Sequence, residues 1–401
     1  MIPEIRIQDY NYVLPDERIA KYPLKERDAS KLLIYKDGDC SETIFTSLPD
    51  ELPADSLMVF NDTKVVPARL FFKRPTGAHI EIFCLEPDSP PEYNSNFAAT
   101  GQCRWKCVIG NSKRLKTGEI LELDADEKDF DGIWPTAKLI SRDGQTGVVE
   151  FFWQGGISFS ELLDRCGRVP IPPYLNRDTE AIDLERYQTT YARIRGSVAA
   201  PTAGLHFTSR VMDNIAAKGI DMETICLHVG AGTFLPVKSS LVADHPMHRE
   251  PFTVKRDLLQ RILDAKSGIT AVGTTSVRTL ESLYYAGASC IENGCPSDIS
   301  QWAPYEREWN YSTGEALGAL IEYLDTKGLD KLSIGTRIII VPGFEFRLVD
   351  RMVTNFHQPQ STLLLLISAF VGGDWRRIYD YALGHGFRFL SYGDSSLLFR
   401  R

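Results

Sequence analysis

The segment from Asp244 to Glu250 reads Asp-His-Pro-Met-His-Arg-Glu and so gathers two histidines and a carboxylate. An imidazole titrates near neutral pH and a neighbouring carboxylate can orient it, so His245, His248 and Glu250 predict an acid–base cluster. The same residue types could ligate a metal ion. Their spacing around Pro246 lacks the one-face geometry of the helical zinc motif His-Glu-x-x-His, so acid–base chemistry is favoured and no metal is expected.

Two further segments, 199–208 and 227–237, combine glycine with a histidine. Small residues let a ligand approach the backbone closely, and a helix that begins at Thr208 would offer free N–H groups to an anion. The second segment lacks the third glycine of a dinucleotide fingerprint, so it predicts a ligand cradle rather than a Rossmann loop. A tight loop around a buried histidine remains the alternative for the first. The candidate residues are Pro201, Thr202, Gly204, His206, His228, Gly230 and Gly232.

The segment 273–281 reads Gly-Thr-Thr-Ser-Val-Arg-Thr-Leu-Glu and follows an apolar run. A strand that ends here and runs into a helix would expose the hydroxyls of Thr275 and Ser276 at the helix start. Arg278, about one turn further, could bind a carboxylate with two N–H groups. The segment is not a phosphate-binding P-loop, because it lacks Gly-Lys-Ser/Thr.

Polar residues also interrupt apolar surroundings in the segments 61–69, 354–362 and 391–394. Each segment could be ordinary turn chemistry, yet each could equally contribute to a binding site. The candidate residues are Asn61, Asp62, Arg69, Asn355, His357 and Asp394. The sequence contains no Gly-x-Ser-x-Gly elbow, which argues against an α/β-hydrolase. Spacing alone therefore predicts an α/β enzyme with a histidine-rich polar pocket.

The elements that must position these residues fall into two patterns. From residue 65 to 153, short apolar runs alternate with turn signals, which predicts a small antiparallel β-barrel or sandwich. The runs are Ile80–Leu85, Trp105–Ile109, Ile120–Leu123, Thr136–Ile140 and Gly147–Phe152. We expect this barrel, residues 65–153, to be inserted into an α/β domain formed by residues 1–64 and 154–401.

The flanking sequence alternates predicted strands and helices, which favours an α/β domain. The strands are expected at 32–35, 57–60, 222–229, 270–272 and 337–341, and residues 391–394 are expected to close a further strand. The helices are expected at 160–166, 208–218, 257–266, 276–285 and 312–324. Thr208 and Ser312 have the types and spacing of helix N-caps, and Gly219 and Gly328 those of helix stops.

Composition narrows the class of protein. The 401 residues are 43% hydrophobic and 24% charged, enough for a packed core, and the net charge of −8 argues against a protein that coats nucleic acid. The N-terminus does not resemble a signal peptide, and the longest apolar run, Leu363–Val371, is far shorter than the roughly 20 residues of a membrane span. We expect a cytoplasmic protein. The eight cysteines include no Cys-x-x-Cys pair and are expected to be reduced thiols.

Taken together, these segments resemble the S-adenosylmethionine:tRNA ribosyltransferase-isomerase family of queuosine biosynthesis. The resemblance spans nearly the whole chain, and many long motifs come in the family's order. They are Tyr10–Pro15, Arg27–Ser30, Asn61–Thr63, Pro67–Leu70, Lys113–Lys116, Tyr187–Arg193, Pro201–Phe207, Leu227–Phe234, His245–Glu250, Gly273–Glu281, Pro342–Phe344, Thr354–His357 and Ser391–Asp394.

The resemblance implies an α/β main domain with an inserted antiparallel β-barrel. It also implies a reaction: the ribosyl part of S-adenosylmethionine passes to 7-aminomethyl-7-deazaguanine at the wobble position of a tRNA. The ribose is rearranged to give epoxyqueuosine, and adenine and methionine are released. S-adenosylmethionine is thus a cosubstrate, no prosthetic group is expected, and the protein is expected to be a monomer that acts on a tRNA anticodon loop.

The implied chemistry assigns provisional roles. A general base removes a proton beside the sulfonium, and the candidates are His228, His245, His248 and His206, with Glu250 as the group that orients the base. Arg278, with Thr275 and Ser276, is the candidate grip on the methionine end, while residues 201–204 and 230–232 would line the nucleoside. The candidate RNA-binding residues are Lys113, Arg114, Lys116, Arg193 and Arg195, and Tyr187 or Phe207 is a candidate ring for stacking on the base.

The sequence departs from the family pattern in three places. Lys64 stands where the family has an arginine, Gln358 and Gln360 replace other residues, and the chain is longer between Tyr284 and Leu332. Lysine keeps the charge but loses the guanidinium fork. Two alternatives therefore stay open: a diverged paralogue that acts on another RNA or a free deazapurine, and a non-catalytic S-adenosylmethionine-responsive RNA-binding protein.

Overall fold

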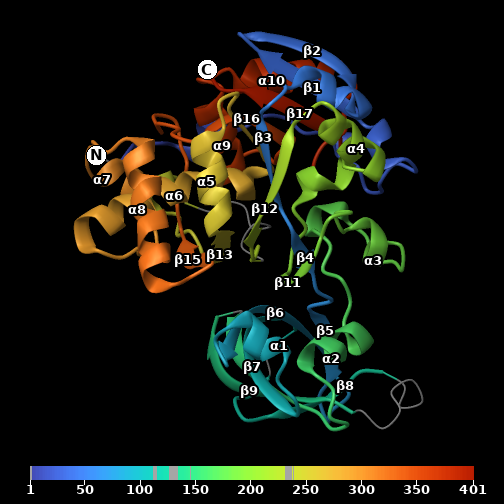
Figure 1. Ribbon diagram of the computed structural model, residues 1–401. Helices are drawn as coiled ribbons and strands as arrows, with labels where there is room; N and C mark the ends of the chain where they lie inside the picture. Colours follow the sequence, from blue (N-terminus) through green and yellow to red (C-terminus); the bar gives the residue numbers. More distant parts are fainter. Residues whose placement is uncertain (1, 112–114, 126–133, 145, 231–236, 238) are drawn as a thin grey trace.

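A computed structural model describes residues 2–111, 115–125, 134–144, 146–230, 237 and 239–401. It has a large α/β domain and a smaller β-barrel that lies to one side of it (Figure 1). The predicted fold class is therefore confirmed. Within the described residues, no helix is both long and apolar enough to cross a bilayer.

The α/β domain is built on a mixed sheet of nine strands. In spatial order these are β15 (Lys331–Thr336), β13 (Glu250–Lys255), β12 (Asp221–Leu227), β3 (Leu57–Asn61), β14 (Ile269–Val272), β16 (Val349–Asn355), β17 (Ser395–Phe399), β1 (Lys31–Lys36) and β2 (Asp39–Ile44). The four neighbours β12, β3, β14 and β16 are parallel. Strands β3 and β14 are buried at every residue, as expected for parallel strands covered on both faces.

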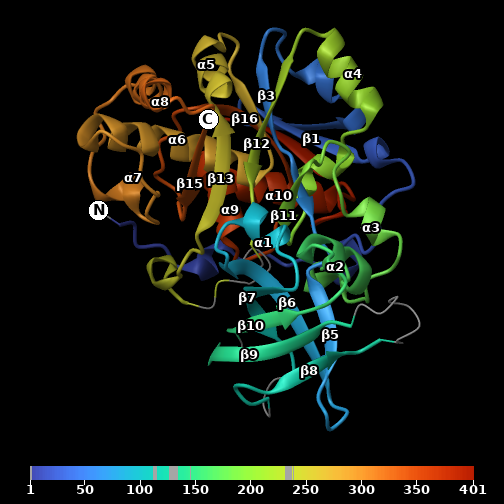
Figure 2. The same ribbon diagram turned by 60° about the horizontal axis from the view of Figure 1, so that its bottom comes forward.

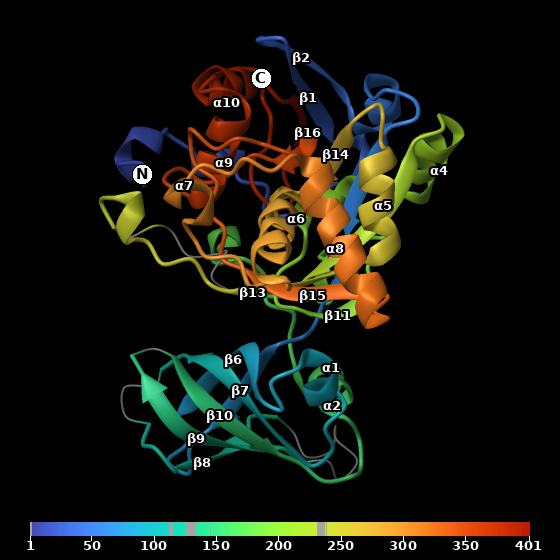
Figure 3. The same cartoon turned by 60° about the vertical axis from the view of Figure 1, so that its left-hand side comes forward.

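Helices cover both faces of this sheet. Alternate residues of β3 enter two separate cores, with Leu57 and Val59 in one and Met58 and Phe60 in the other. One face carries α5 (Arg256–Asp264), α6 (Thr274–Asn293), α8 (Thr313–Lys327), α9 (Thr362–Phe370) and α10 (Trp375–Gly384), as Figure 3 shows. The other face carries α4 (Ser209–Ala217) and the 3-10 helix Phe45–Glu51. The short helices α3 (Asp183–Arg186) and α7 (Ala303–Glu306) lie in connections.

The smaller domain is a closed antiparallel barrel. Its strands, in order around the barrel, are β10 (Thr146–Phe152), β7 (Gln102–Ile109), β6 (His79–Ser89), β5 (Arg69–Lys73), β8 (Ile120–Leu123) and β9 (Thr136–Asp143). Alternating residues such as Phe72, Trp105 and Phe151 fill its core. Two helices, α1 (Tyr93–Phe97) and α2 (Phe159–Cys166), lie at the end of the barrel that faces the α/β domain (Figure 2). Phe159 of α2 packs into the barrel core, while the boundaries at 65 and 153 remain a prediction.

The barrel is attached where the parallel strand β3 ends. The chain leaves β3 at Asn61 and passes through β4 (Thr63–Val65), which pairs in parallel with β11 (Ile194–Ser197). These two short strands lead toward the barrel (Figure 1). The barrel therefore lies beyond the carboxyl ends of the parallel strands.

Most predicted elements form where local signals place them. Thr208 caps α4 with its hydroxyl oxygen, which accepts a hydrogen bond from the backbone N–H of Val211, and Ser312 and Glu315 form a reciprocal capping box at α8. The predicted helix 276–285 is longer, because it continues to Asn293.

Two strand predictions are wrong. Residues 337–341 form no strand, because their main chain bonds to Arg278 Nε, the Gln301 carbonyl and the Tyr305 hydroxyl instead of a ladder, and the strand ends at Thr336. Residues 391–394 precede β17 instead of closing a strand, since they form a turn in which Gly393 N–H donates to the Leu390 carbonyl.

Candidate active site

A cleft lies at the carboxyl ends of the parallel strands. Residues that follow β12, β14 and β16 line it, namely Gly230, Thr274 and His357. In open α/β sheets ligands bind at this edge, because the loops from neighbouring strands meet there. The cleft has two parts that share Thr274, Thr275, Ser361 and Leu363 at the start of α6 and α9.

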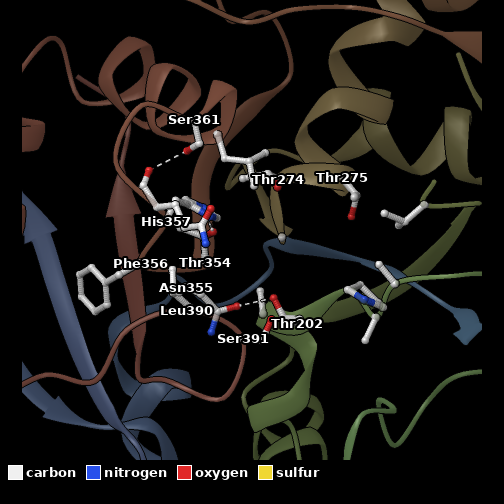
Figure 4. A pocket seen from close by; sticks show the side chains of 18 of the residues that line it. Thr202, Thr274, Thr275, Thr354, Asn355, Phe356, His357, Ser361, Leu390 and Ser391 are labelled. Atoms are coloured by element: carbon white, nitrogen blue, oxygen red, sulfur yellow. Dashed lines mark hydrogen bonds between the residues drawn. The ribbon is translucent and has the colours of Figure 1, made fainter. Parts of the chain in front are cut away.

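The first part, which we call the hydroxyl half, is lined by uncharged polar groups (Figure 4). They include Tyr174, Thr202, Thr274, Thr354, Asn355, His357, Ser361 and Ser391, from separate segments of the chain. The hydroxyls of Tyr174 and Ser391 lie 2.6 Å apart, close enough to hydrogen-bond. Such groups can bind a neutral polar ligand such as a nucleoside.

A chain of hydrogen bonds holds the hydroxyl half from behind. The Thr202 hydroxyl donates to Asn355 Oδ1 at 2.8 Å, and Asn355 Nδ2 lies 3.4 Å from His206 Nε2. His206 Nδ1 in turn lies 2.9 Å from the Ser30 hydroxyl. Burial lowers the pKa of His206 to about 4, so this imidazole is neutral near pH 7 and serves as a support beneath the cleft.

His357 lies in the wall of the hydroxyl half. Its Nε2 is 3.0 Å from the Thr354 hydroxyl, and its backbone N–H donates to the Tyr379 hydroxyl at 3.0 Å. Burial lowers its pKa to about 3. The hydroxyl half is therefore uncharged at neutral pH.

The second part, which we call the ionic half, contains ionisable groups. It is lined by His245, His248, Glu250 and Arg278, with Gly230 and Ile338–Ile340 completing the wall. The first three come from the segment Asp244–Glu250 and line one wall of the cleft, while their acid–base role stays a prediction.

Glu250 and Arg278 form a buried ion pair. Arg278 Nη1 contacts Glu250 Oε2, and its Nε donates to the Ile338 carbonyl at 3.1 Å. Both side chains are less than a tenth exposed. Arg278 Nη2 is buried and has no hydrogen-bond partner among the described residues, which leaves this NH2 group of the guanidinium for a ligand. Glu250 thus orients a guanidinium in this part of the chain, where the sequence suggested an imidazole.

The two histidines differ in exposure. His245 is half-buried, and burial together with the like charge of His248 lowers its pKa. A neutral imidazole can accept a proton, so His245 is in the form that a general base needs at neutral pH. His248 is exposed.

The start of α6 joins the two halves. Gly273, at a φ of 86°, turns the chain from β14 into the helix. The Thr275 hydroxyl is buried without a hydrogen-bond partner in the described part of the chain, whereas the Ser276 hydroxyl donates to the Val272 carbonyl at 2.7 Å and faces away from the cleft. Of the two predicted hydroxyls, Thr275 alone lines the cleft.

Comparison with known proteins gives this site a family. Residues 7–398 match the family model described as queuosine biosynthesis protein. The chain belongs to this family. S-adenosylmethionine:tRNA ribosyltransferase-isomerases from Trichlorobacter lovleyi and Anaeromyxobacter sp. strain Fw109-5 are 38% and 37% identical to it, over 98% and 99% of this chain and 99% of each relative. Membership confirms the prediction of an enzyme of the transferase and isomerase type.

A solved structure is also similar. The crystal structure of an S-adenosylmethionine tRNA ribosyltransferase from Thermotoga maritima has 26% sequence identity and a TM-score of 0.46. The match covers 97% of this chain and 99% of that one.

Several predicted residues lie outside the cleft. Asn61 ties β3 to β12, because its amide donates to the Leu227 carbonyl and accepts from the Leu227 N–H, each at 3.0 Å. Asp394 binds Arg388, and Arg69 lies on the barrel beside Glu81. These side chains make contacts within the protein, and the local sequence around them, which is typical of turns, did not predict those contacts.

Four other predicted residues are also packed away from the cleft, and three of them, Asp62, Gly204 and His206, are buried. Asp62 is buried, and burial raises its pKa. Gly204 is packed so closely that a Cβ atom there would lie 1.9 Å from the Tyr191 hydroxyl oxygen. His228 stacks on Tyr93 of the barrel helix α1, with ring centroids 4.3 Å apart. His206, described above, lies behind Asn355.

The described RNA-binding candidates lie on the barrel and at β11. Lys116 and Arg193 are exposed, and Arg195 pairs with Asp164 at 2.6 Å. Lys113 and Arg114, like the predicted cleft residue Gly232, lie outside the described residues. Tyr187 and Phe207 are fully buried, so neither offers a free ring face on the surface for stacking.

Sequence reasoning missed part of the hydroxyl half. Thr354 and Ser361 fall within a segment that the sequence singled out, and Ser391 begins another, but their hydroxyls were not singled out within those segments. Tyr174 follows a proline-rich stretch that gave no chemical signal. Across the described residues, no group of three or more potential metal ligands occurs.

Proposed function

We propose that this protein transfers and isomerises the ribosyl part of S-adenosylmethionine onto 7-aminomethyl-7-deazaguanine at the wobble position of tRNA. Adenine and methionine are released and epoxyqueuosine remains in the tRNA. The observation that carries this proposal is the two-part cleft, in which an uncharged polar half adjoins a half with imidazoles and a guanidinium. Its support is membership of the queuosine biosynthesis protein family, whose named relatives are S-adenosylmethionine:tRNA ribosyltransferase-isomerases.

The two halves suit the two ends of the donor. S-adenosylmethionine has a neutral nucleoside at one end and a charged amino acid at the other. Thr202 and Asn355 in the hydroxyl half provide hydrogen-bonding groups for the nucleoside. Arg278 in the ionic half keeps a buried Nη2 for a carboxylate, which a guanidinium binds with a charge-assisted hydrogen bond.

Proton removal is assigned to the ionic half. The sulfonium acidifies the adjacent methylene carbon, and a base that takes this proton leads to ring opening and loss of adenine. His245 and His248 are the histidines of the original set that line the described cleft, because His206 and His228 are packed elsewhere. Since the pKa of His245 is lowered, it accepts the proton from a neutral starting state.

The acceptor approaches from the side of the barrel. The connectors β4 and β11 leave the sheet at the same edge as the cleft. Strand β4 contains Lys64, and Arg193 directly precedes β11. Basic groups there can contact the phosphates of an anticodon loop although the protein as a whole is acidic.

Release of adenine tests the proposal. The purified protein is incubated with S-adenosylmethionine and with tRNA that carries the aminomethyl-deazaguanine precursor, and adenine is quantified. We expect adenine to appear with this tRNA and not with the free deazapurine. Release with the free base would instead indicate a diverged paralogue, and binding of both ligands without any release would indicate a non-catalytic RNA-binding protein.

A further inference from the structure

The segment Asp298–Gln301 lies in the connection between α6 and α8. It runs beside residues 335–339, with Ile299 N–H donating to the Gly335 carbonyl at 2.9 Å and Ile339 N–H donating to the Gln301 carbonyl at 3.1 Å. Arg337 N–H also donates to the Ile299 carbonyl at 2.9 Å. The main chain of this segment is therefore fixed against the strand that ends at Thr336.

The side chain of Gln301 reaches from there to the loop that carries the cleft histidines. Its Nε2 donates to the His245 carbonyl at 2.7 Å, and its Oε1 accepts from the Met247 N–H at 2.9 Å. In an extended chain the carbonyl of one residue and the N–H of the second residue after it point to the same side. The side-chain amide of Gln301 thus bonds to both the His245 carbonyl and the Met247 N–H, as the main chain of a neighbouring strand would.

Asp298 holds the same loop on the other side of His248. Its carboxylate binds Arg249 through two hydrogen bonds of 2.5 and 3.0 Å, and it accepts the Gly335 N–H at 2.7 Å. The loop is therefore tied to one short segment on both sides of His248. Gln301 bonds to its backbone before His248, and Asp298 binds the Arg249 side chain after it.

This segment also adjoins the partner of Glu250. The Ile338 carbonyl, which accepts from Arg278 Nε, lies in the stretch that pairs with residues 299–301. Glu250 itself is paired in register with Thr336. The histidine loop and the Arg278–Glu250 pair are consequently held against one another through residues 335–339.

We propose that Gln301 and Asp298 are positioning residues that hold the loop His245–Glu250 so that its imidazoles face the cleft. As a statement about catalysis this rests on the proposed function, whereas as a statement about loop order it does not. Positioning matters because a misplacement of about 1 Å can cost about a hundredfold in rate.

The first test is Gln301→Met, which keeps the length of the side chain and removes both hydrogen bonds. We expect faster hydrogen exchange in residues 245–250 and a kcat for adenine release that falls about tenfold or more, with the donor KM within about threefold. Gln260→Met is the matched control, since Gln260 is exposed on α5 and bonds locally to Asp264. Unchanged exchange, or faster exchange with an unchanged kcat, overturns the proposal.

A second variant, Gln301→Glu, separates positioning from general packing. Its carboxylate can still accept from the Met247 N–H but cannot donate to the His245 carbonyl, and it adds a negative charge beside His245. We expect the acid limb of the kcat/KM profile to move to higher pH, whereas Gln301→Met leaves the limb in place. A limb that does not move in Gln301→Glu contradicts the placement of Gln301 at the catalytic loop.

These outcomes are distinguishable from failure of the proposed function. Hydrogen exchange needs no substrate, so it judges loop order in the free protein. If the wild-type protein releases no adenine, the proposed function fails, while unchanged exchange in Gln301→Met defeats the inference on its own.

Discussion

The two halves of the cleft share one edge of one sheet but are built by different means. The hydroxyl half gains its order from neutral hydrogen bonds that run from Thr202 through Asn355 to the buried His206. The ionic half gains its order from the Arg278–Glu250 pair and from a loop fixed by the side chain of Gln301. The buried histidines of the hydroxyl half are therefore neutral, whereas the ionic half contains a buried pair of opposite charges.

This difference separates binding from proton transfer. His206 and His357 have pKa values of about 4 and 3, so near neutral pH they are poor proton acceptors and serve as hydrogen-bonding groups. His245 and His248 are more accessible to solvent. Substitutions in the two halves should accordingly differ in kind as well as in size.

The largest effect is expected for His245→Ala and His248→Ala. Loss of a general base typically costs about 10²- to 10⁴-fold in rate, so the variant that removes the base should lower kcat for adenine release by that factor. The matched control is His385→Ala, because His385 is an exposed histidine at the end of α10. Proton exchange at the methylene carbon beside the sulfur can be followed in parallel. Wild-type rates in both cleft variants would refute the assignment of the base to the ionic half.

The next effect concerns stability. Arg278→Met leaves the buried Glu250 carboxylate without its cation, which should lower the free energy of unfolding by about 3–5 kcal/mol in urea titrations. The double variant Arg278→Met, Glu250→Leu should recover most of this loss. Arg377→Met, which breaks the exposed pair with Asp39, should cost less than about 1 kcal/mol. Equal losses for Arg278→Met and Arg377→Met would contradict the buried character of the first pair.

A smaller effect is expected from pH. The pKa of His206 falls from 6.5 when unfolded to about 4 when folded, so the unfolded chain binds the extra proton. The contribution of neutral His206 to the free energy of unfolding is fully present above pH 6.5. It is lost as the pH falls toward 4, by about 3 kcal/mol in total. In the variant His206→Gln, the free energy of unfolding should depend less on pH between 4 and 6.5. A slope equal to that of the wild type would show that His206 is not buried in the neutral form.

The smallest effect is expected in the hydroxyl half. Thr202→Val removes one neutral hydrogen bond to Asn355 and should cost about 1 kcal/mol, or roughly fivefold in donor affinity by calorimetric titration, with kcat nearly unchanged. Thr253→Val, on the exposed face of β13, is the control and should leave affinity unchanged. A large fall in kcat for Thr202→Val would contradict the assignment of binding to the hydroxyl half and of proton transfer to the ionic half.

Local signals were sufficient for most of the fold. Alternating apolar residues predict the barrel strands, because every second side chain of a short strand points into the core. Helix caps at Thr208 and Ser312 act within one turn and are equally readable. The strand predicted at 337–341 failed because its main-chain partners come from Arg278, Gln301 and Tyr305, far away in the sequence.

For the site, the sequence determined which segments meet, because loops after parallel strands share one edge of the sheet. It did not determine which histidine in those segments is accessible. An imidazole is neutral and structural, or open and reactive, according to what surrounds it in space, and for His206 the partners are Ser30 and Asn355. The orientation of Arg278 likewise depends on a residue of another element, because its guanidinium pairs with Glu250 of β13. Residue types and motif order are local and are fixed by the sequence, while burial and pairing depend on long-range packing that only the tertiary structure decides.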